Sequence, residues 1–134
     1  MRLVLLYPPP GKLSLPDETQ GSRRDVPQNY LDRLIEDEDF LTAPYGILSL
    51  AAQAMRAGHE VFVFNLSNFP WPEVEVLIRH VDADLFALSC HAANRSGVDL
   101  TAKLIRAVYP NAHIACGGPF VSSLPAETLT SFHP

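Results

Sequence analysis

The sequence is short of basic residues, cysteines and long apolar runs, and each shortage excludes a class of protein. Ten Lys and Arg against fifteen Asp and Glu give a formal net charge of −5, and the basic residues are scattered, so no basic patch for nucleic acid is expected. The only two cysteines, Cys90 and Cys116, argue against the disulfide framework of a small secreted protein and favour a reducing, cytoplasmic setting. The apolar run at residues 3–6 is too short for a signal peptide or a membrane span.

Glycine-rich loops that bind phosphate are also missing. A dinucleotide-binding protein carries its glycine fingerprint directly after the first strand, where this chain has Pro8-Pro9-Pro10-Gly11. No basic residues gather in the loops that follow the later apolar runs. A free nucleotide triphosphate is therefore not the expected ligand.

The chain does contain a regular alternation of strand-like and helix-like segments. With 134 residues, 47% of them hydrophobic, it can build one core of ordinary size. Strands are predicted at residues 3–7, 61–64, 85–88 and 113–116, and helices, from apolar residues spaced by three and four, at 44–58, 72–81, 97–109 and from about Pro125. Thr42 is the candidate N-terminal cap of the first helix and Gly58 its C-terminal stop. Apolar strands that alternate with amphipathic helices predict a doubly wound α/β domain, a parallel sheet flanked by helices.

One polar stretch interrupts the alternation. Residues 12–43 are charged and poor in apolar runs, and we interpret them as an insertion, in which residues 30–35 could form one short helix. The whole of 1–134 is expected to form one domain. Because no fifth strand follows the last predicted helix, we expect a fragment of a longer polypeptide, truncated before its last strand.

The loops after the predicted strands are the candidate ligand site. They span 7–11, 65–68, 89–94 and 117–120, and in a parallel sheet they lie together at the carboxyl edge. They are rich in small residues, amides and hydroxyls, which suits a large, flat or elongated ligand held by backbone contacts. The pair Gly117-Gly118 allows a ligand to approach the backbone closely, although a tight strand-to-helix turn is an equally good explanation of it.

Several short motifs carry a resemblance to a known family. They are Leu-Leu-Tyr-Pro-Pro at 5–9, Pro-Tyr-Gly-Ile-Leu at 44–48, Ala-Gly-His-Glu-Val at 57–61, Leu-Ser-Cys at 88–90, Gly-Gly-Pro-Phe at 117–120 and Leu-Pro at 124–125. In this order and spacing the chain resembles the N-terminal cobalamin-binding domain of B12-dependent radical SAM enzymes, over nearly its whole length apart from the insertion. The resemblance implies a Rossmann-like domain that holds a corrinoid. The dimethylbenzimidazole tail would lie beside the sheet near Ser89 and Gly117-Gly118, with the corrin ring over the loops after Tyr7 and Ser89.

The loops and the resemblance together give the candidate cofactor-binding residues, and no catalytic or metal-ligating residue is assigned. The candidates are Tyr7, Pro8, Pro9, Asn65, Ser89, Cys90, His91, Ala92, Gly117, Gly118 and Pro119. We expect His91 to hydrogen-bond the corrinoid periphery, since a lone loop histidine is more often a solvated or hydrogen-bonding side chain than a cobalt ligand. We expect Cys90 and Cys116 to pack as small hydrophobic residues and not to act as catalytic thiols.

The chain departs from related patterns in two places. The Asp-x-His-x-x-Gly motif of the wider cobalamin-binding class is replaced by Pro8-Pro9-Pro10-Gly11, so no histidine ligand to cobalt is expected from that loop. The three-cysteine motif of radical SAM enzymes is absent, because the only two cysteines are 26 positions apart. A [4Fe-4S] cluster and S-adenosylmethionine would therefore belong to a region beyond Pro134.

The resemblance implies a module that performs no bond-making itself. It would present cobalamin to a downstream radical SAM domain, for methyl transfer to, or related modification of, an unactivated carbon of a small-molecule substrate, with a methyltransferase or cyclase as the parent enzyme. The alternative is a cofactor-free flavodoxin-like or receiver-like regulatory domain, which is disfavoured because the first and third strands end in Tyr7-Pro8 and Ser89-Cys90 and not in an acidic cluster. A third possibility is the same fold in a radical SAM enzyme that no longer binds cobalamin.

Overall fold

The computed structural model describes residues 1–10 and 44–131. The predicted insertion at 12–43, with its short helix and the candidate cap Thr42, lies outside the described residues. Within the described part, no helix combines the length and the apolar character needed to cross a bilayer.

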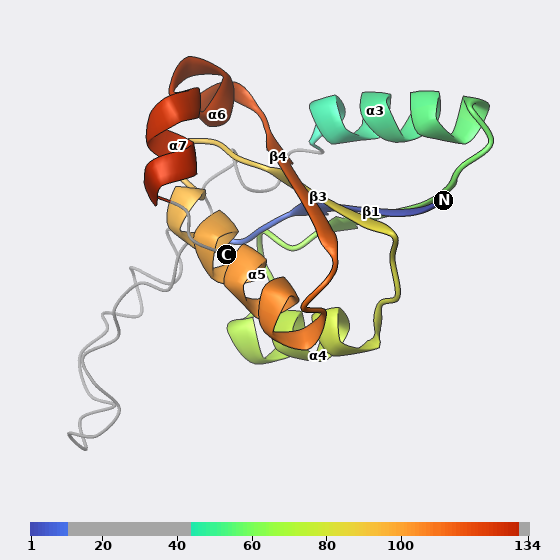
Figure 1. Ribbon diagram of the computed structural model, residues 1–134, viewed down its shortest axis with the longest axis horizontal. Coiled ribbons are helices and arrows are strands. Elements are labelled where there is room, and N and C mark those ends of the chain that lie inside the picture. The colour runs from blue at the N-terminus through green and yellow to red at the C-terminus, as the bar shows by residue number, and fades with distance from the viewer. Residues whose placement is uncertain (11–43, 132–134) are drawn as a thin grey trace.

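A sheet of four parallel strands forms the centre of the fold (Figure 1). The strands are β1 (Arg2–Tyr7), β2 (Glu60–Asn65), β3 (Leu85–Ser89) and β4 (His113–Gly117), in the order β2-β1-β3-β4. The strand β2 lies on one side of β1, and β3 and β4 lie on the other. The order of strands therefore reverses between β1 and β3, which makes this gap the switch point of the sheet. Doubly wound sheets bind ligands at this switch point, beyond the carboxyl ends of the strands.

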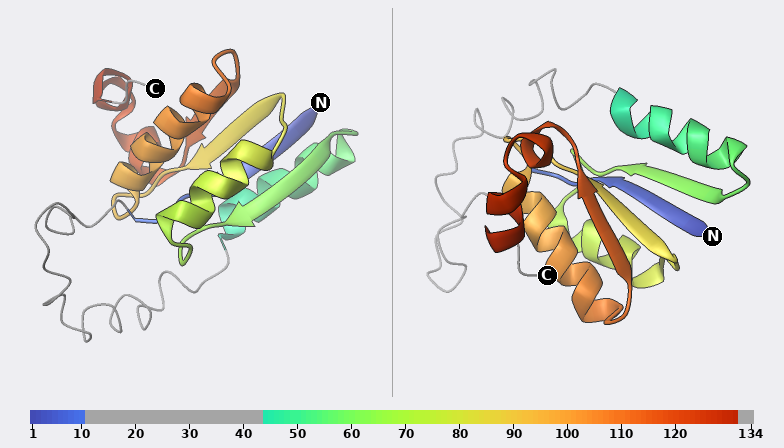
Figure 2. Two further views of the ribbon diagram at one scale, coloured as in Figure 1. Left: turned by 90° about the horizontal axis from the view of Figure 1, so that it is seen from below. Right: turned by 45° about the horizontal axis from the view of Figure 1, so that its top comes forward.

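Helices cover both faces of the sheet (Figure 2). On one face lies α3 (Tyr45–Arg56), and on the other lie α4 (Trp71–His80) and α5 (Arg95–Val108). Two short helices, α6 (Pro119–Ser123) and α7 (Pro125–Ser131), follow β4. The described chain is a Rossmann-like α/β fold, which confirms the predicted doubly wound architecture.

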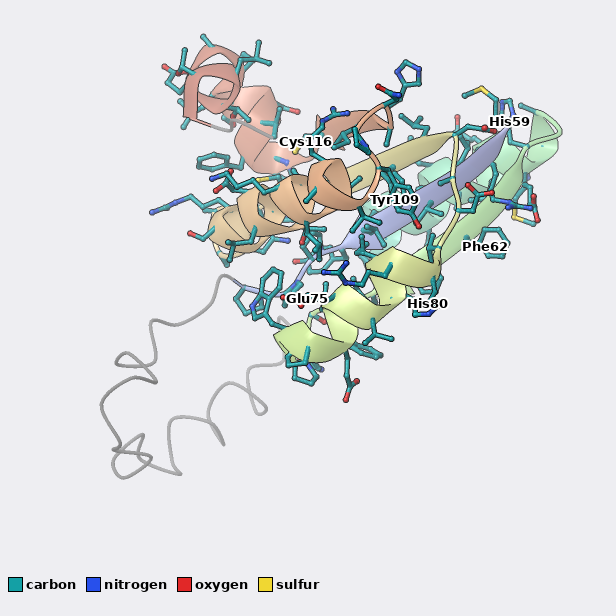
Figure 3. The ribbon with its side chains drawn as sticks, turned by 60° about the horizontal axis from the view of Figure 1, so that its bottom comes forward. His59, Phe62, Glu75, His80, Tyr109 and Cys116 are labelled. Carbon is teal, nitrogen blue, oxygen red and sulfur yellow. The ribbon has the colours of Figure 1, made fainter. Side chains whose placement is uncertain are left out.

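The two-residue period of the strands divides the core into two layers. On β1, Leu3 and Leu5 pack under α3 with Ile47 and Ala51. The intervening residues of β1 and its neighbours face α4 and α5 in a larger cluster that includes Val4, Leu6, Phe86, Val74, Ile78, Val98 and Ile105. Just beyond α5 lies Tyr109, which is labelled in Figure 3. Its ring stacks on that of Phe86 of β3, with ring centroids 5.6 Å apart. The core has two layers because the strands carry apolar side chains on both faces of the sheet.

The helix α3 covers only part of its face. It packs on β2 and β1, while Ala115 and Gly117 of β4 are exposed on the same side of the sheet. Over β3 and β4 this face has no covering helix in the described part of the chain. The uncovered area adjoins the switch point.

Arg2 joins the strands at the opposite, amino-terminal edge. Its Nε lies 2.9 Å from Glu60 and its Nη1 3.0 Å from Asp82, and its backbone N–H donates to Asp84 at 2.6 Å. The hydrogen bond to Glu60 raises the pKa of the Arg2 guanidinium. These are exposed pairs, which contribute little stability, but they gather acidic residues at the edge farthest from the strand tips.

The observed elements agree with the predicted ones to within two or three residues, except around α6. The predicted helices at 72–81 and 97–109 are Trp71–His80 and Arg95–Val108. The helix α6 was not predicted, because five residues are too few to show a helical period. Its local signal is Pro119 at the first helical position, where the missing N–H costs nothing.

Candidate functional site

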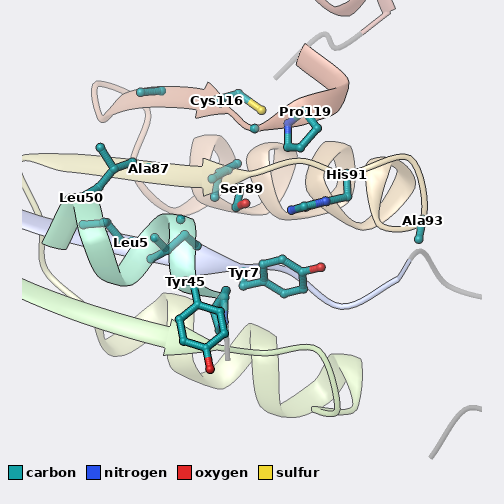
Figure 4. Close-up of a pocket in the computed structure, with 17 residues that line it drawn as sticks. Leu5, Tyr7, Tyr45, Leu50, Ala87, Ser89, His91, Ala93, Cys116 and Pro119 are labelled. Carbon is teal, nitrogen blue, oxygen red and sulfur yellow. The ribbon is translucent and has the colours of Figure 1, made fainter. Parts of the chain in front are cut away.

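A cavity of about 770 Å³ opens at the carboxyl edge of the sheet, on the face that carries α3. This volume lies within the usual range of ligand sites, roughly 300–1,000 Å³. Its lining residues come from β1, β3, β4, the first turns of α3 and the loops that follow β3 and β4 (Figure 4). The cavity therefore occupies the switch point and the part of the sheet that α3 leaves uncovered.

Small and uncharged residues give the cavity its depth. Leu5, Ala87 and Ala115 stand side by side in the parallel register and form one row of its floor. The next row toward the edge contains Ser89 beside Gly117. No Asp, Glu, Lys or Arg lines the cavity in the described residues. Such a lining suits an uncharged, flat ligand group that makes few but specific polar contacts.

Two aromatic rings stand at the loop end of the cavity. Tyr7 is the last residue of β1 and His91 lies in the loop after β3, and their ring centroids are 5.6 Å apart with a tilt of 54°. Both side chains line the cavity, and Figure 4 shows them beside each other at the strand tips. This pair therefore spans the switch point.

Gly117 at the end of β4 and Gly118 just after it differ in whether the backbone requires glycine. Gly118 has φ +107°, and a Cβ there would lie 2.6 Å from the carbonyl oxygen of Cys90, so the turn itself requires glycine. Gly117 has no positive φ, and a Cβ there would meet nothing within 4 Å. The turn therefore explains Gly118 but not Gly117. Because Gly117 has no side chain, this part of the cavity stays open.

Of the predicted site residues, six line the cavity. They are Tyr7, Ser89, His91, Gly117, Gly118 and Pro119. The sequence placed them in three separate loops, and the parallel topology brings these loops to one edge. Whether they contact a cofactor stays a prediction.

The other five predicted residues lie outside the cavity lining. Pro8 and Pro9 are buried, and Cys90 packs in the core cluster on the opposite face of the sheet. Asn65 uses its amide oxygen locally, where it accepts hydrogen bonds from the N–H of Ser67 at 3.2 Å and from its hydroxyl at 2.7 Å. Ala92 is exposed beyond the cavity.

Sequence reasoning missed the contribution of α3 and the role of Asn94. The helix lines the cavity through Tyr45, Gly46, Ile47 and Leu50. The signal in the sequence was Leu50, an apolar residue three positions after Ile47 in α3. In the structure its side chain is not covered by the core and stays 60% exposed. Asn94 is fully buried and contacts the loops after β1 and β3; a single asparagine in a loop gives no sequence signal of this.

Cys90 packs as a small hydrophobic residue, as predicted, whereas Cys116 is half-buried and also borders the cavity. Burial raises the pKa of the Cys90 thiol to about 12, with a further rise from the neighbouring Cys116 thiol. Burial also raises the pKa of Cys116. The thiolate, which is the nucleophilic form, is therefore scarce at neutral pH.

We expect Cys90 in a Cys116→Ser variant to react with a soluble aromatic disulfide at pH 8 only after unfolding. In the wild-type chain the pKa of Cys90 rises from 9.0 to about 12, with burial as the largest cause. Because this burial persists when Cys116 is replaced, the thiolate fraction of Cys90 in the variant stays well below that of an exposed thiol. The folded chain keeps this proton between pH 9.0 and about 12 while the unfolded chain releases it, so stability from Cys90 is present below this window and falls as pH rises through it. Thiol titration with and without urea measures the reactivity, and equal rates in both states would contradict the expectation.

A family model described as the B12 binding domain matches residues 34–133. The match spans well over half of the chain of 134 residues and includes β2, β3, β4 and all the described helices. No curated protein and no solved structure matches the chain.

Proposed function

The chain belongs to the B12-binding domain family, and on this premise we propose that it holds cobalamin at the cavity beside α3 and presents it to a radical SAM catalytic domain. The reaction served would be methyl transfer to, or a related modification of, an unactivated carbon. The observation that carries the proposal is the uncharged cavity at the switch point, with Gly117 open toward it.

The residues present fit part of a corrinoid. A cobalamin is larger than the drug-sized ligands that cavities of this volume bury, so the cavity suits its nucleotide tail better than the whole molecule. The floor of Leu5, Ala87 and Ala115 offers an apolar surface to a flat heterocycle. A side chain at Gly117 would fill open space in this cavity. The absence of charged lining residues also matches an uncharged ring system.

Each wall of the cavity has a distinct part in the proposal. Ser89 and the Gly117 backbone would bind the tail at the strand tips, and Leu50 of α3 would cover it from the opposite side. Tyr7 and His91 would lie at the mouth, where they can contact the periphery of the corrin ring and exclude water. When bound, cobalamin supplies a cobalt centre that can carry a methyl group or change its oxidation state.

The radical SAM assignment rests on sequence features. Pro8-Pro9-Pro10 stand where the wider cobalamin-binding class has its histidine loop, so we propose that no imidazole from this loop reaches cobalt. In residues 1–10 and 44–131, no group of three His, Cys, Asp or Glu side chains could hold a metal ion. The iron-sulfur cluster and S-adenosylmethionine would therefore be held by the catalytic domain.

The cofactor-free receiver-like alternative receives no support from the charges. A receiver domain needs acidic residues at the strand tips, whereas Glu60, Asp82 and Asp84 lie at the amino-terminal edge with Arg2. The cavity at the tips is lined without carboxylates in the described part. The arrangement is the reverse of what a phospho-acceptor site requires.

Reconstitution with hydroxocobalamin tests the first half of the proposal. We expect the folded chain to retain corrinoid after desalting, with visible absorbance bands that co-elute with the protein. Loss of all colour under conditions in which the chain is folded would contradict corrinoid binding. The radical SAM half is tested by reading the gene beyond the codon for Pro134, where a three-cysteine cluster motif is expected.

A further inference from the structure

Asn94 occupies the N-cap position of α5 but does not cap the helix. Asparagine at this position normally accepts a hydrogen bond from a backbone N–H in the first turn. Here the side chain makes no capping bond, and it is 0% exposed. The amide is therefore buried for a purpose other than helix initiation.

The Asn94 amide bridges the two strand tips at the switch point. Its Nδ2 donates to the carbonyl of Pro8 at 3.3 Å and to the carbonyl of Ser89 at 3.1 Å. Its Oδ1 accepts from the N–H of His91 at 2.7 Å. One side chain thus satisfies backbone groups from the loop after β1, the end of β3 and the loop after β3.

Strand pairing within the sheet does not connect the tips of β1 and β3. The β1–β3 ladder ends at Leu6 and Leu88, whereas the β3–β4 ladder continues to Ser89 and Gly117. The Pro8-Pro9-Pro10 loop has no backbone N–H groups, because proline lacks this donor. This loop therefore cannot donate to the Ser89 carbonyl, and Asn94 supplies that donor as well as the one for the Pro8 carbonyl.

A second contact holds the same loop against α5. A Cβ at Gly97 would overlap the Pro9 carbonyl oxygen, so the first turn of α5 packs directly on the backbone of the proline loop. The position of this loop relative to β3 is thus determined by α5. Asn94 and Gly97 act on consecutive residues of the loop.

We propose that Asn94 is the positioning residue of the cofactor site: it fixes Tyr7, Ser89 and His91 relative to one another across the switch point. The inference rests on the proposed function and deepens it. Asn94 does not line the cavity, so its effect on a ligand is transmitted through the three residues it positions. Thr101, also 0% exposed and on α5, bonds only to the Gly97 carbonyl of its own helix, and it is the matched control.

The test compares the full chain with Asn94→Ala, Asn94→Asp and Thr101→Val by absorbance titration with hydroxocobalamin. We expect Asn94→Ala to weaken binding by about 30-fold, since it leaves three backbone groups without their partner, and Thr101→Val to change it by less than about threefold. In Asn94→Asp the carboxylate can accept from His91 but cannot donate to either carbonyl, so binding relative to the wild type should recover as the carboxyl becomes protonated at lower pH. Equal affinities for the Asn94 and Thr101 variants would overturn the inference.

Amide hydrogen exchange provides a readout that needs no cofactor. We expect the His91 amide to lose protection in Asn94→Ala but to keep it in Asn94→Asp, whose carboxylate still accepts from this N–H, and in Thr101→Val. If the wild type binds no corrinoid, the proposed function fails while the exchange result still decides the positioning role. Unchanged protection at His91 in Asn94→Ala would overturn that role, whatever the affinities. Should Asn94→Ala fail to fold, Asn94→Leu, which has a similar volume and makes none of the three hydrogen bonds, replaces it in both measurements.

Discussion

Gly117→Leu is expected to remove corrinoid binding while the chain stays folded. The backbone at Gly117 has no positive φ and a Cβ meets nothing within 4 Å, so the larger side chain fits the ligand-free protein. It would occupy the cavity beside Ser89, in the space proposed for the nucleotide tail. We expect retention of hydroxocobalamin to fall at least tenfold, whereas the free energy of unfolding changes by no more than about 1 kcal/mol.

The matched control is Ala107→Leu, which also introduces a leucine, on an exposed part of α5 away from the cavity. Hydroxocobalamin titration measures binding and urea denaturation measures stability for both variants. Normal corrinoid retention by folded Gly117→Leu would show that the ligand lies elsewhere.

Gly118→Ala is expected to destabilise the fold by about 2–6 kcal/mol, although it adds a single methyl group. A side chain at φ +107° is strained by roughly 1–3 kcal/mol. The added Cβ would also lie 2.6 Å from the Cys90 carbonyl oxygen and 3.0 Å from its nitrogen, and relief of such overlap typically costs about 1–3 kcal/mol. Because both contacts are to backbone, no side chain can rotate away.

Gly117→Ala is the neighbouring control for this substitution. It meets no atom, and replacing glycine restricts the unfolded chain, so its effect should be neutral or stabilising by about 0.4–1 kcal/mol. Urea denaturation of the two variants gives the comparison. Equal stabilities would mean that the turn at Gly118 relaxes without cost.

The order of strands and helices could be predicted because each apolar segment has its own period. The helical spacing in Val74, Leu77 and Ile78 and the continuous run at Leu85–Ser89 are local properties of the sequence, and the structure preserves both. The short helix α6 was missed since its stabilising contacts are turns after Gly118, not a repeated pattern. The predicted insertion lies outside the described residues.

The site was predicted less completely because sequence identifies loops but not the direction of side chains. The loops after β1, β3 and β4 do meet at one edge, yet Pro8 and Cys90 turn into the interior while Tyr7 and Ser89 face the cavity. The contribution of α3 depends on how much of the sheet it covers, which is a tertiary property. The bridging role of Asn94 depends on where the β1–β3 ladder stops, and no local pattern encodes that.

The early end of the β1–β3 ladder also determines how this edge opens. Beyond Leu6 and Leu88, where the pairing of β1 with β3 ends, the hydrogen bonds of Asn94 join the two strand tips. Local opening requires less free energy where fewer backbone bonds must break, so the strand tips can part as a small unit while the ladder from Leu3 to Leu6 stays closed.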